Sequence, residues 1–271
     1  MKSEKKISEL LVLIRGAGEM ASGVAHRLHQ SHFKLCMTEV SHPLAVRREV
    51  SFCEAVYEGE KEVEGAQAKL ISRHDEIESI WKKGHIPILI DPEANKTRDF
   101  LKPDVLIDAI MAKKNLGTHM EDAPLVIGLG PGFNARKDVH IVIETNRGHH
   151  LGKMILNGEA EPDTGIPGEV GGYTVERLLR TMKKGIFRPQ KSIGDKVTKG
   201  SVVAVVDDYP VIAEVSGVVR GLLREGIEVE KGIKVGDIDP RGKKEFCFTI
   251  SDKARSIGGG VLEAILYWFN R

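Results

Sequence analysis

The first half of the chain alternates short apolar runs with segments of helical periodicity. An apolar run at 11–15 is followed by an amphipathic segment at 19–30 and a second apolar run at 34–40. Further apolar runs lie at 86–91, 104–108, 125–129 and 139–144, and short helices are expected at 75–83 and 93–101. Alternating strands and helices are typical of an α/β protein built on a parallel sheet.

Near Lys183 the pattern changes to short β-rich runs with frequent glycines. The segments 193–200 and 224–232 echo each other, and a repeat of about thirty residues in a β-rich region predicts two interlocked hairpin units around one small core. With 210–220 as its central strands and glycine turn, this part resembles the biotinyl/lipoyl carrier fold. Such carriers place a modified lysine on a hairpin tip, but this chain has Asp207-Asp-Tyr-Pro210 there. We therefore expect neither biotin nor lipoate.

These patterns predict three parts. Residues 1–182 form a Rossmann-like, parallel-sheet nucleotide-binding domain, with a helix at its end over 173–182. Residues 183–244 form a small all-β barrel-sandwich-hybrid module of the biotinyl/lipoyl kind. Residues 245–271 contribute a strand and a helix that packs back on the first domain.

The C-terminal helix is expected over 255–270. Ile257, Val261, Ile265 and Trp268 recur at helical spacing, so one face should be buried. Its glycines 258–260 either seat an anion at the helix start or permit close approach of two backbones, and we favour packing.

The first apolar run ends in Gly16-Ala-Gly-Glu-Met-Ala21, here called the first glycine turn. In a dinucleotide-binding turn the first glycine allows a tight bend, the second lets the backbone approach a pyrophosphate, and a small third residue lets the helix pack on the strand. The first helical N–H groups then face the phosphate. Candidate contacts are therefore Gly16, Ala17, Gly18, Glu19, Met20 and Ala21. The alternative is a structural turn whose glycines only save space.

Glu39 ends the second apolar run, where a dinucleotide-binding protein carries its ribose-binding carboxylate. This placement is the reason for considering an NAD(P)-like dinucleotide as the ligand. The alternative is a solvated charge at the end of a strand.

A second strand leads into Gly128-Leu-Gly-Pro-Gly-Phe133, here called the second glycine loop. Gly128, Gly130 and Gly132 permit positive φ and can aim successive N–H groups at an anion. Downstream, Arg147 lies on a glycine-hinged loop with His149 and His150, as in a phosphate or carboxylate clamp. Whether Arg147 and the two histidines contact a ligand is left open by the sequence.

Two strands end on acids, Asp91 and Asp108. Each acid either lines a ligand cleft at the carboxyl end of the sheet or caps the segment that follows. Histidines 26, 29 and 32 are spaced by three, but His32 lies beyond the expected helix end and no acid or cysteine completes a ligand set. We interpret them as a solvated helix face and expect no metal.

The composition limits the kinds of partner that the chain is expected to bind. Forty basic and 39 acidic residues give a net charge of +1, so neither a nucleic acid nor an acidic membrane is expected as a partner. The three cysteines are far apart in sequence, which argues against disulfides and zinc. The apolar stretch 10–14 is too short for a signal or a membrane span, so a soluble cytoplasmic protein is expected, and a homo-oligomer is left open.

Taken together, several blocks resemble the YqeB family, accessory proteins of the selenium-dependent molybdenum hydroxylase system. The blocks are 14–28, 51–59, 128–133, 144–152 and 257–264. The first domain is also similar to the Rossmann domain of XdhC-type accessory proteins. The resemblance implies a maturation factor whose ligand is a nucleotide or molybdopterin nucleotide. Its implied partners are the hydroxylase or its cofactor-assembly proteins.

Two other functions are left open by the residues. One is an NAD(P)-dependent oxidoreductase of a small substrate, in which His149 or His150 would have to serve as the acid. The other is a non-catalytic scaffold that docks the hydroxylase. Whether the chain catalyses any reaction is left open.

Overall fold

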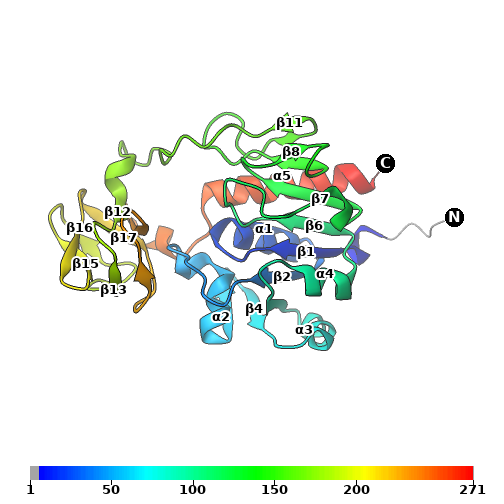
Figure 1. Ribbon diagram of the computed structural model, residues 1–271, viewed down its shortest axis with the longest axis horizontal. Coiled ribbons are helices and arrows are strands. Elements are labelled where there is room, and N and C mark those ends of the chain that lie inside the picture. The colour runs from blue at the N-terminus through cyan, green and yellow to red at the C-terminus, as the bar shows by residue number, and fades with distance from the viewer. Residues whose placement is uncertain (1–5, 271) are drawn as a thin grey trace. The chain divides into compact units, whose positions relative to one another are not determined.

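The computed structural model describes residues 6–270, which divide into two compact units (Figure 1). Unit 1 takes the described parts of Met1–Pro43, Ser51–Asp163 and Ile250–Arg271, and unit 2 takes Leu44–Val50 and Thr164–Thr249. The divisions therefore fall earlier than the predicted 182/183 and later than 244/245. The short segment Leu44–Val50 joins unit 2 because its Val46 carbonyl accepts a hydrogen bond from the Leu222 amide at 2.8 Å.

Unit 1 is built on a nine-stranded sheet in the order β10-β9-β7-β6-β1-β2-β5-β4-β3. In that order the strands are Met154–Ile155, Ile141–Ile143, Leu125–Leu129, Val105–Asp108, Leu11–Arg15, Lys34–Glu39, Ile86–Ile90, Ala66–Leu70 and Glu60–Val63. The strands from β9 to β4 run parallel, whereas β10 and β3 run antiparallel to their neighbours. A separate antiparallel pair joins β8, Asn134–Ala135, to β11, Gly158–Glu159.

The mixed sheet corrects the predicted fold class. Strands β3 and β4 form a hairpin whose two turn residues, Glu64 and Gly65, have φ of +46° and +81°. Two residues with positive φ make the turn that best matches the twist of a hairpin, and this turn sets β3 antiparallel. The sequence analysis predicted no strand at 60–63 or 66–70. Residues 6–270 contain no clear Rossmann module, so the expected parallel-sheet domain was wrong.

The helices of unit 1 are α1 to α5. They span Glu19–Gln30, Ala55–Glu58, Ile77–Lys82, Asn95–Leu101 and Asp252–Phe269. Short 3-10 helices lie at Ile7–Glu9, Phe52–Glu54, His74–Glu76 and Met120–Asp122. No helix within residues 6–270 combines the length and the apolar character needed to cross a membrane.

Helices α1 and α5 pack side by side (Figure 1). A Cβ added to Gly23 would lie 2.7 Å from the Ala254 Cβ, and one added to Gly258 would lie 3.0 Å from the Gly23 carbonyl oxygen. A Cβ at Gly260 would overlap the Gly152 carbonyl oxygen. Gly258 and Gly260 therefore lie inside α5 and permit close backbone approach, which confirms the packing interpretation for these two, whereas a Cβ at Gly259 would meet nothing within 4 Å.

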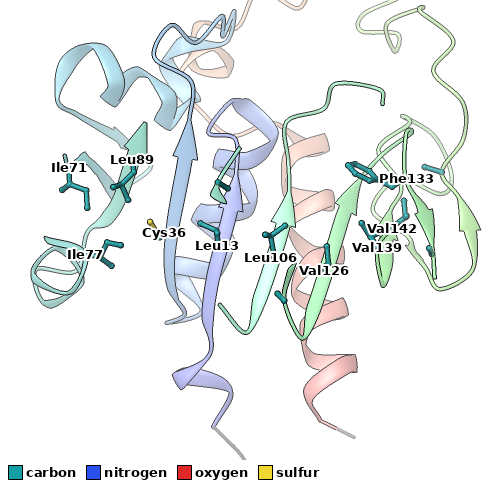
Figure 2. Packing of buried hydrophobic residues seen from close by; sticks show 14 of the residues in the cluster. Leu13, Cys36, Ile71, Ile77, Leu89, Leu106, Val126, Phe133, Val139 and Val142 are labelled. Atoms are coloured by element: carbon teal, nitrogen blue, oxygen red, sulfur yellow. The ribbon is translucent and has the colours of Figure 1, made fainter. Parts of the chain in front are cut away.

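The core of unit 1 lies on the faces of this sheet. Figure 2 shows Leu13, Cys36, Leu106 and Val126 on neighbouring strands, and each is at most 2% exposed. Because the central strands are covered on both faces, their sequences are continuous apolar runs rather than alternating ones. This explains why the sequence located them well.

Unit 2 contains two four-stranded antiparallel sheets. One has the order β12-β19-β17-β14, with bounds Leu178–Arg180, Lys234–Asp239, Gly217–Leu222 and Lys196–Val197. The other has the order β16-β15-β13-β18, with bounds Tyr209–Ile212, Val202–Val206, Gly185–Pro189 and Glu228–Val229. Short 3-10 helices lie at Arg48–Val50, Val175–Arg177 and Lys244–Cys247.

Three expectations for this part of the chain are corrected. The described residues form two four-stranded antiparallel sheets and no clear biotinyl/lipoyl module. The predicted helix over 173–182 is instead a 3-10 turn followed by β12, whose Leu178 pairs with Asp237 of β19. The predicted strand over 245–250 is replaced by the 3-10 helix Lys244–Cys247. Asp207 and Asp208 do form the tip of the β15–β16 hairpin.

Candidate functional site

The first glycine turn connects β1 to α1 as the sequence predicts. Gly16 has φ of +96°, and a Cβ there would lie 3.2 Å from the Ala109 carbonyl oxygen, so the bend requires glycine. Gly18 is the N-cap of α1, and a Cβ added to it would meet no heavy atom within 4 Å. The first N–H groups of a helix have no acceptor within the helix, and in α1 these belong to Glu19, Met20 and Ala21. The open space at Gly18 therefore lies next to these N–H groups.

Glu39 stabilises the first glycine turn. Its carboxylate accepts hydrogen bonds from the Ala17 amide at 2.8 Å and from the Val40 amide at 2.8 Å. Burial raises the pKa of Glu39, and these two amide hydrogen bonds act in the opposite direction. Both carboxylate oxygens are thus engaged with backbone, and the structure gives Glu39 a role in holding the bend.

Asp108 and Asp91 both have structural partners. Asp108, 2% exposed, accepts from Arg15 at 3.3 Å and from the Thr118 hydroxyl at 2.7 Å. Arg15 also donates to the Leu116 carbonyl oxygen at 2.9 Å, so this pair anchors the loop after β6. Asp91 accepts from the amide and the hydroxyl of Thr97 at 2.8 and 2.9 Å and so caps the first turn of α4.

The second glycine loop is closely packed. A Cβ at Gly128 would lie 2.5 Å from the Phe133 ring, and one at Gly130 would overlap the Thr145 hydroxyl. At Gly132, with φ of +106°, it would lie 2.6 Å from the Lys114 amide nitrogen. The glycines of this loop therefore accommodate neighbouring parts of unit 1.

Arg147 is paired within unit 1. Its guanidinium donates to both carboxylate oxygens of Asp252, at 2.5 and 3.0 Å. His149 and His150 are exposed, and His150 lies 3.2 Å from the Glu161 carboxylate. This bidentate ion pair orients Arg147 toward the start of α5. An anionic ligand there would have to compete with the Asp252 carboxylate for the Arg147 guanidinium.

Lys253, in the first turn of α5, is the residue that sequence reasoning missed. It is partly buried, and no acceptor of a hydrogen bond from its ammonium is found among residues 6–270. Burial lowers the pKa of Lys253, the neighbouring cations Lys113 and Arg147 lower it further, and Glu19 and Glu144 raise it. No spacing in the sequence relates Lys253 to the first glycine turn. The two are close only because α5 packs on α1.

The starts of α1 and α5 are joined directly. The Ser251 hydroxyl, which caps α5 by accepting from the Ala254 amide at 3.3 Å, donates to the Glu19 carboxylate at 3.0 Å. The two helices run in the same direction, since Gly23 meets Ala254 while Arg27 meets Gly258. Two helix N-termini, each carrying partial positive charge, therefore lie together at the carboxyl end of the sheet.

Comparison with known proteins gives one clear relative. No family model matches the chain. The chain is 48% identical over 266 residues to the uncharacterized protein YqeB of Escherichia coli K12, which covers 98% of this chain and 49% of that protein. The chain thus spans about half the length of this curated relative.

Some solved structures are weakly similar. A succinylglutamate desuccinylase/aspartoacylase from Rhodobacter sphaeroides is 16% identical, with 50% of this chain and 58% of that chain covered and a TM-score of 0.23. An aspartoacylase family protein from Mesorhizobium loti is 13% identical, with 78% and 58% covered and a TM-score of 0.27. Likenesses this slight carry no argument about activity.

The family resemblance rests on the sequence relative alone. The 48% identity extends over almost all of this chain and supports its assignment to the YqeB family, for the half of the relative that it spans.

Proposed function

We propose that unit 1 binds a phosphate-bearing ligand, a nucleotide or a nucleotide-bearing cofactor, at the first glycine turn. The observation that carries this proposal is the open space at Gly18, where an added Cβ meets nothing within 4 Å at the start of a twelve-residue helix. A phosphate oxygen approaching this point would reach N–H groups that have no acceptor inside the helix.

The strand order supports the position. From β1 the sheet extends through β2 on one side and through β6 on the other. In open α/β sheets, ligands bind at the carboxyl ends of the strands where the order reverses in this way. The Arg15–Asp108 pair occupies the ends of β1 and β6 themselves, which leaves the helix start at Gly18 as the approach.

The charges around the turn support an anion as the bound group. Burial is the main cause of the lowered pKa of Lys253, and Lys113 and Arg147 lie close enough to Lys253 to lower it further. An anionic ligand would relieve this repulsion between cations, whereas Glu19 and Glu144 only partly offset it. Since Glu39 holds the bend with both oxygens, we assign recognition to the phosphate groups rather than to a ribose.

The resemblance to the YqeB family adds a biological role to this proposal. In that role the chain is an accessory factor for a selenium-dependent molybdenum hydroxylase, and the ligand is a nucleotide or the nucleotide-bearing molybdenum cofactor. Hydroxylase partners, a homo-oligomer and a cytoplasmic location belong to the same proposal.

A ligand titration tests the binding step. The thermal midpoint is measured with NAD, ATP, CTP, pyrophosphate and molybdopterin nucleotide, in the unaltered chain and in Gly18→Val. A ligand at several hundred times its dissociation constant should stabilise the folded protein by about 3 kcal/mol. Gly18→Val should abolish this effect because its side chain occupies the approach to the helix start.

The matched control is Gly259→Val, since a Cβ at Gly259 in α5 also meets nothing within 4 Å. This variant should keep the full ligand response. If no nucleotide or pyrophosphate shifts the midpoint, or if Gly18→Val responds as the control does, the proposed function is wrong and the non-catalytic scaffold is favoured.

A further inference from the structure

A cavity at the amino end of the sheet gathers imidazole and ammonium groups. It has a volume of about 460 Å³ and lies where α1 and α3 end and where β2 and β5 begin. Its titratable wall groups are His29, His32, Lys34, Glu78, Lys82 and His85. This end of the sheet is opposite the first glycine turn, so the cavity is separate from the proposed nucleotide site.

We propose that this cavity is a second binding site, which takes a multiply charged oxyanion such as a phosphate ester or a polycarboxylate and binds it more tightly as the histidines become protonated. Its volume is in the range of small-molecule sites. We call it the amino-end pocket.

The charge balance of the wall favours an anion. Glu78 is the single carboxylate among the wall groups, and it already lies 3.3 Å from the Lys82 ammonium. Lys34 has no carboxylate partner among the described residues, and its ammonium stands 5.7 Å from the centre of the Trp81 ring. One ammonium and three imidazoles are therefore left to face a ligand.

One imidazole carries an unsatisfied atom. The His85 Nδ1 is buried and has no hydrogen-bond partner within residues 6–270. Since buried polar atoms in proteins are nearly always paired, an orphaned ring nitrogen in a cavity wall points to a bound group that supplies the partner. When protonated, this nitrogen donates to an oxyanion.

The histidines explain the expected pH dependence. Burial lowers the pKa of His29, and the neighbouring imidazoles of His26, His32 and His85 lower it further. An anion in the pocket would offset this mutual repulsion and so promote protonation. His29 is in the last turn of α1, whose partial negative charge also favours an imidazolium. Binding should therefore take up protons and weaken as pH rises.

Calorimetric titration of the full chain with inorganic phosphate and with citrate tests this site. The Gly18→Val protein is used throughout, so that the first glycine turn does not contribute and the two proposals can fail separately. Affinity should be about tenfold higher at about pH 6 than at about pH 8, which corresponds to uptake of about half a proton on average over this range. The two ligands distinguish a phosphate site from a carboxylate site.

Two variants locate the binding. Lys34→Gln should weaken binding severalfold at both pH values, and His29→Gln should remove most of the pH dependence. Lys83→Gln is the matched control, because Lys83 is exposed beside Lys82 but does not line the cavity.

The proposal is overturned if neither ligand binds at about pH 6, if affinity does not change with pH, or if Lys34→Gln and Lys83→Gln weaken binding equally.

Discussion

The two glycine-rich loops of unit 1 follow strands in the same way, yet their surroundings differ. At the first glycine turn an added Cβ at Gly18 meets no atom within 4 Å, whereas in the second glycine loop a Cβ at Gly132 would lie 2.6 Å from the Lys114 amide nitrogen. The same residue type therefore leaves space for a ligand at one position and lets two chain segments pack at the other. A glycine pattern alone does not distinguish these uses.

The largest expected effect comes from the Arg15–Asp108 ion pair, which anchors the loop after β6, and Lys114 of that loop lies against the second glycine loop. Arg15→Met would leave Asp108, 2% exposed, without its cation, and should lower the free energy of unfolding by about 3–5 kcal/mol. Chemical denaturation measures this value. Because Arg15 also holds the loop that contains Lys114, the cost of Gly132→Ala should be smaller in this background than in the unaltered chain.

Strictly additive costs would show that the Arg15 contacts do not position the wall of the second glycine loop. The two substitutions would then act on independent parts of unit 1.

The next largest effect compares the two loops directly. Gly132→Ala combines a positive φ with a clash against backbone and should destabilise unit 1 by about 2–4 kcal/mol. Gly18→Ala should cost less than about 1 kcal/mol, because Gly18 has extended backbone and open space. Equal losses in chemical denaturation would contradict the distinction drawn between the loops.

A smaller effect is expected at Lys253. Burial lowers the pKa of Lys253, so keeping this lysine protonated costs the folded protein free energy at every pH below the lowered pKa, and the cost is lost as pH rises from there to the ordinary lysine value. Lys253→Met should therefore stabilise the ligand-free protein slightly at neutral pH, by about 0.5 kcal/mol, while reducing the stabilisation given by a bound anion. This stabilisation should disappear at alkaline pH, where the lysine itself becomes neutral.

Thermal unfolding of both proteins with and without pyrophosphate, followed against pH, measures the two changes. If Lys253→Met is less stable than the unaltered chain without ligand and is still fully stabilised by pyrophosphate, Lys253 does not belong to the site.

The elements that the sequence located well are those decided by local pattern. The bounds of α1 agree with the predicted 19–30, and Glu39 ends β2 as expected, because a continuous apolar strand, a glycine bend and an amphipathic helix are all local signals. Asp91 and Asp108 were left between two roles, and the structure supplies the partners that make both structural.

The remaining features depend on distant parts of the chain. The hairpin at Glu64 and Gly65 changes the sheet class, but its polar strand β3 gives little hydrophobic signal. In the sequence, Leu178 and Leu179 resemble part of a helix. Only their pairing with β19 makes this segment a strand. Lys253 becomes a candidate only because α5 packs on α1, more than 200 residues away in sequence.

The most direct test of the difference between the loops is an amide NMR titration of the isotope-labelled chain with pyrophosphate. The amide signals of Gly18 and Glu19 should shift strongly and saturate together, while those of Gly130 and Gly132 stay in place. Shifts confined to Gly130 and Gly132, or no saturable shift at Gly18, would contradict the claim that the open helix start is where the anion binds.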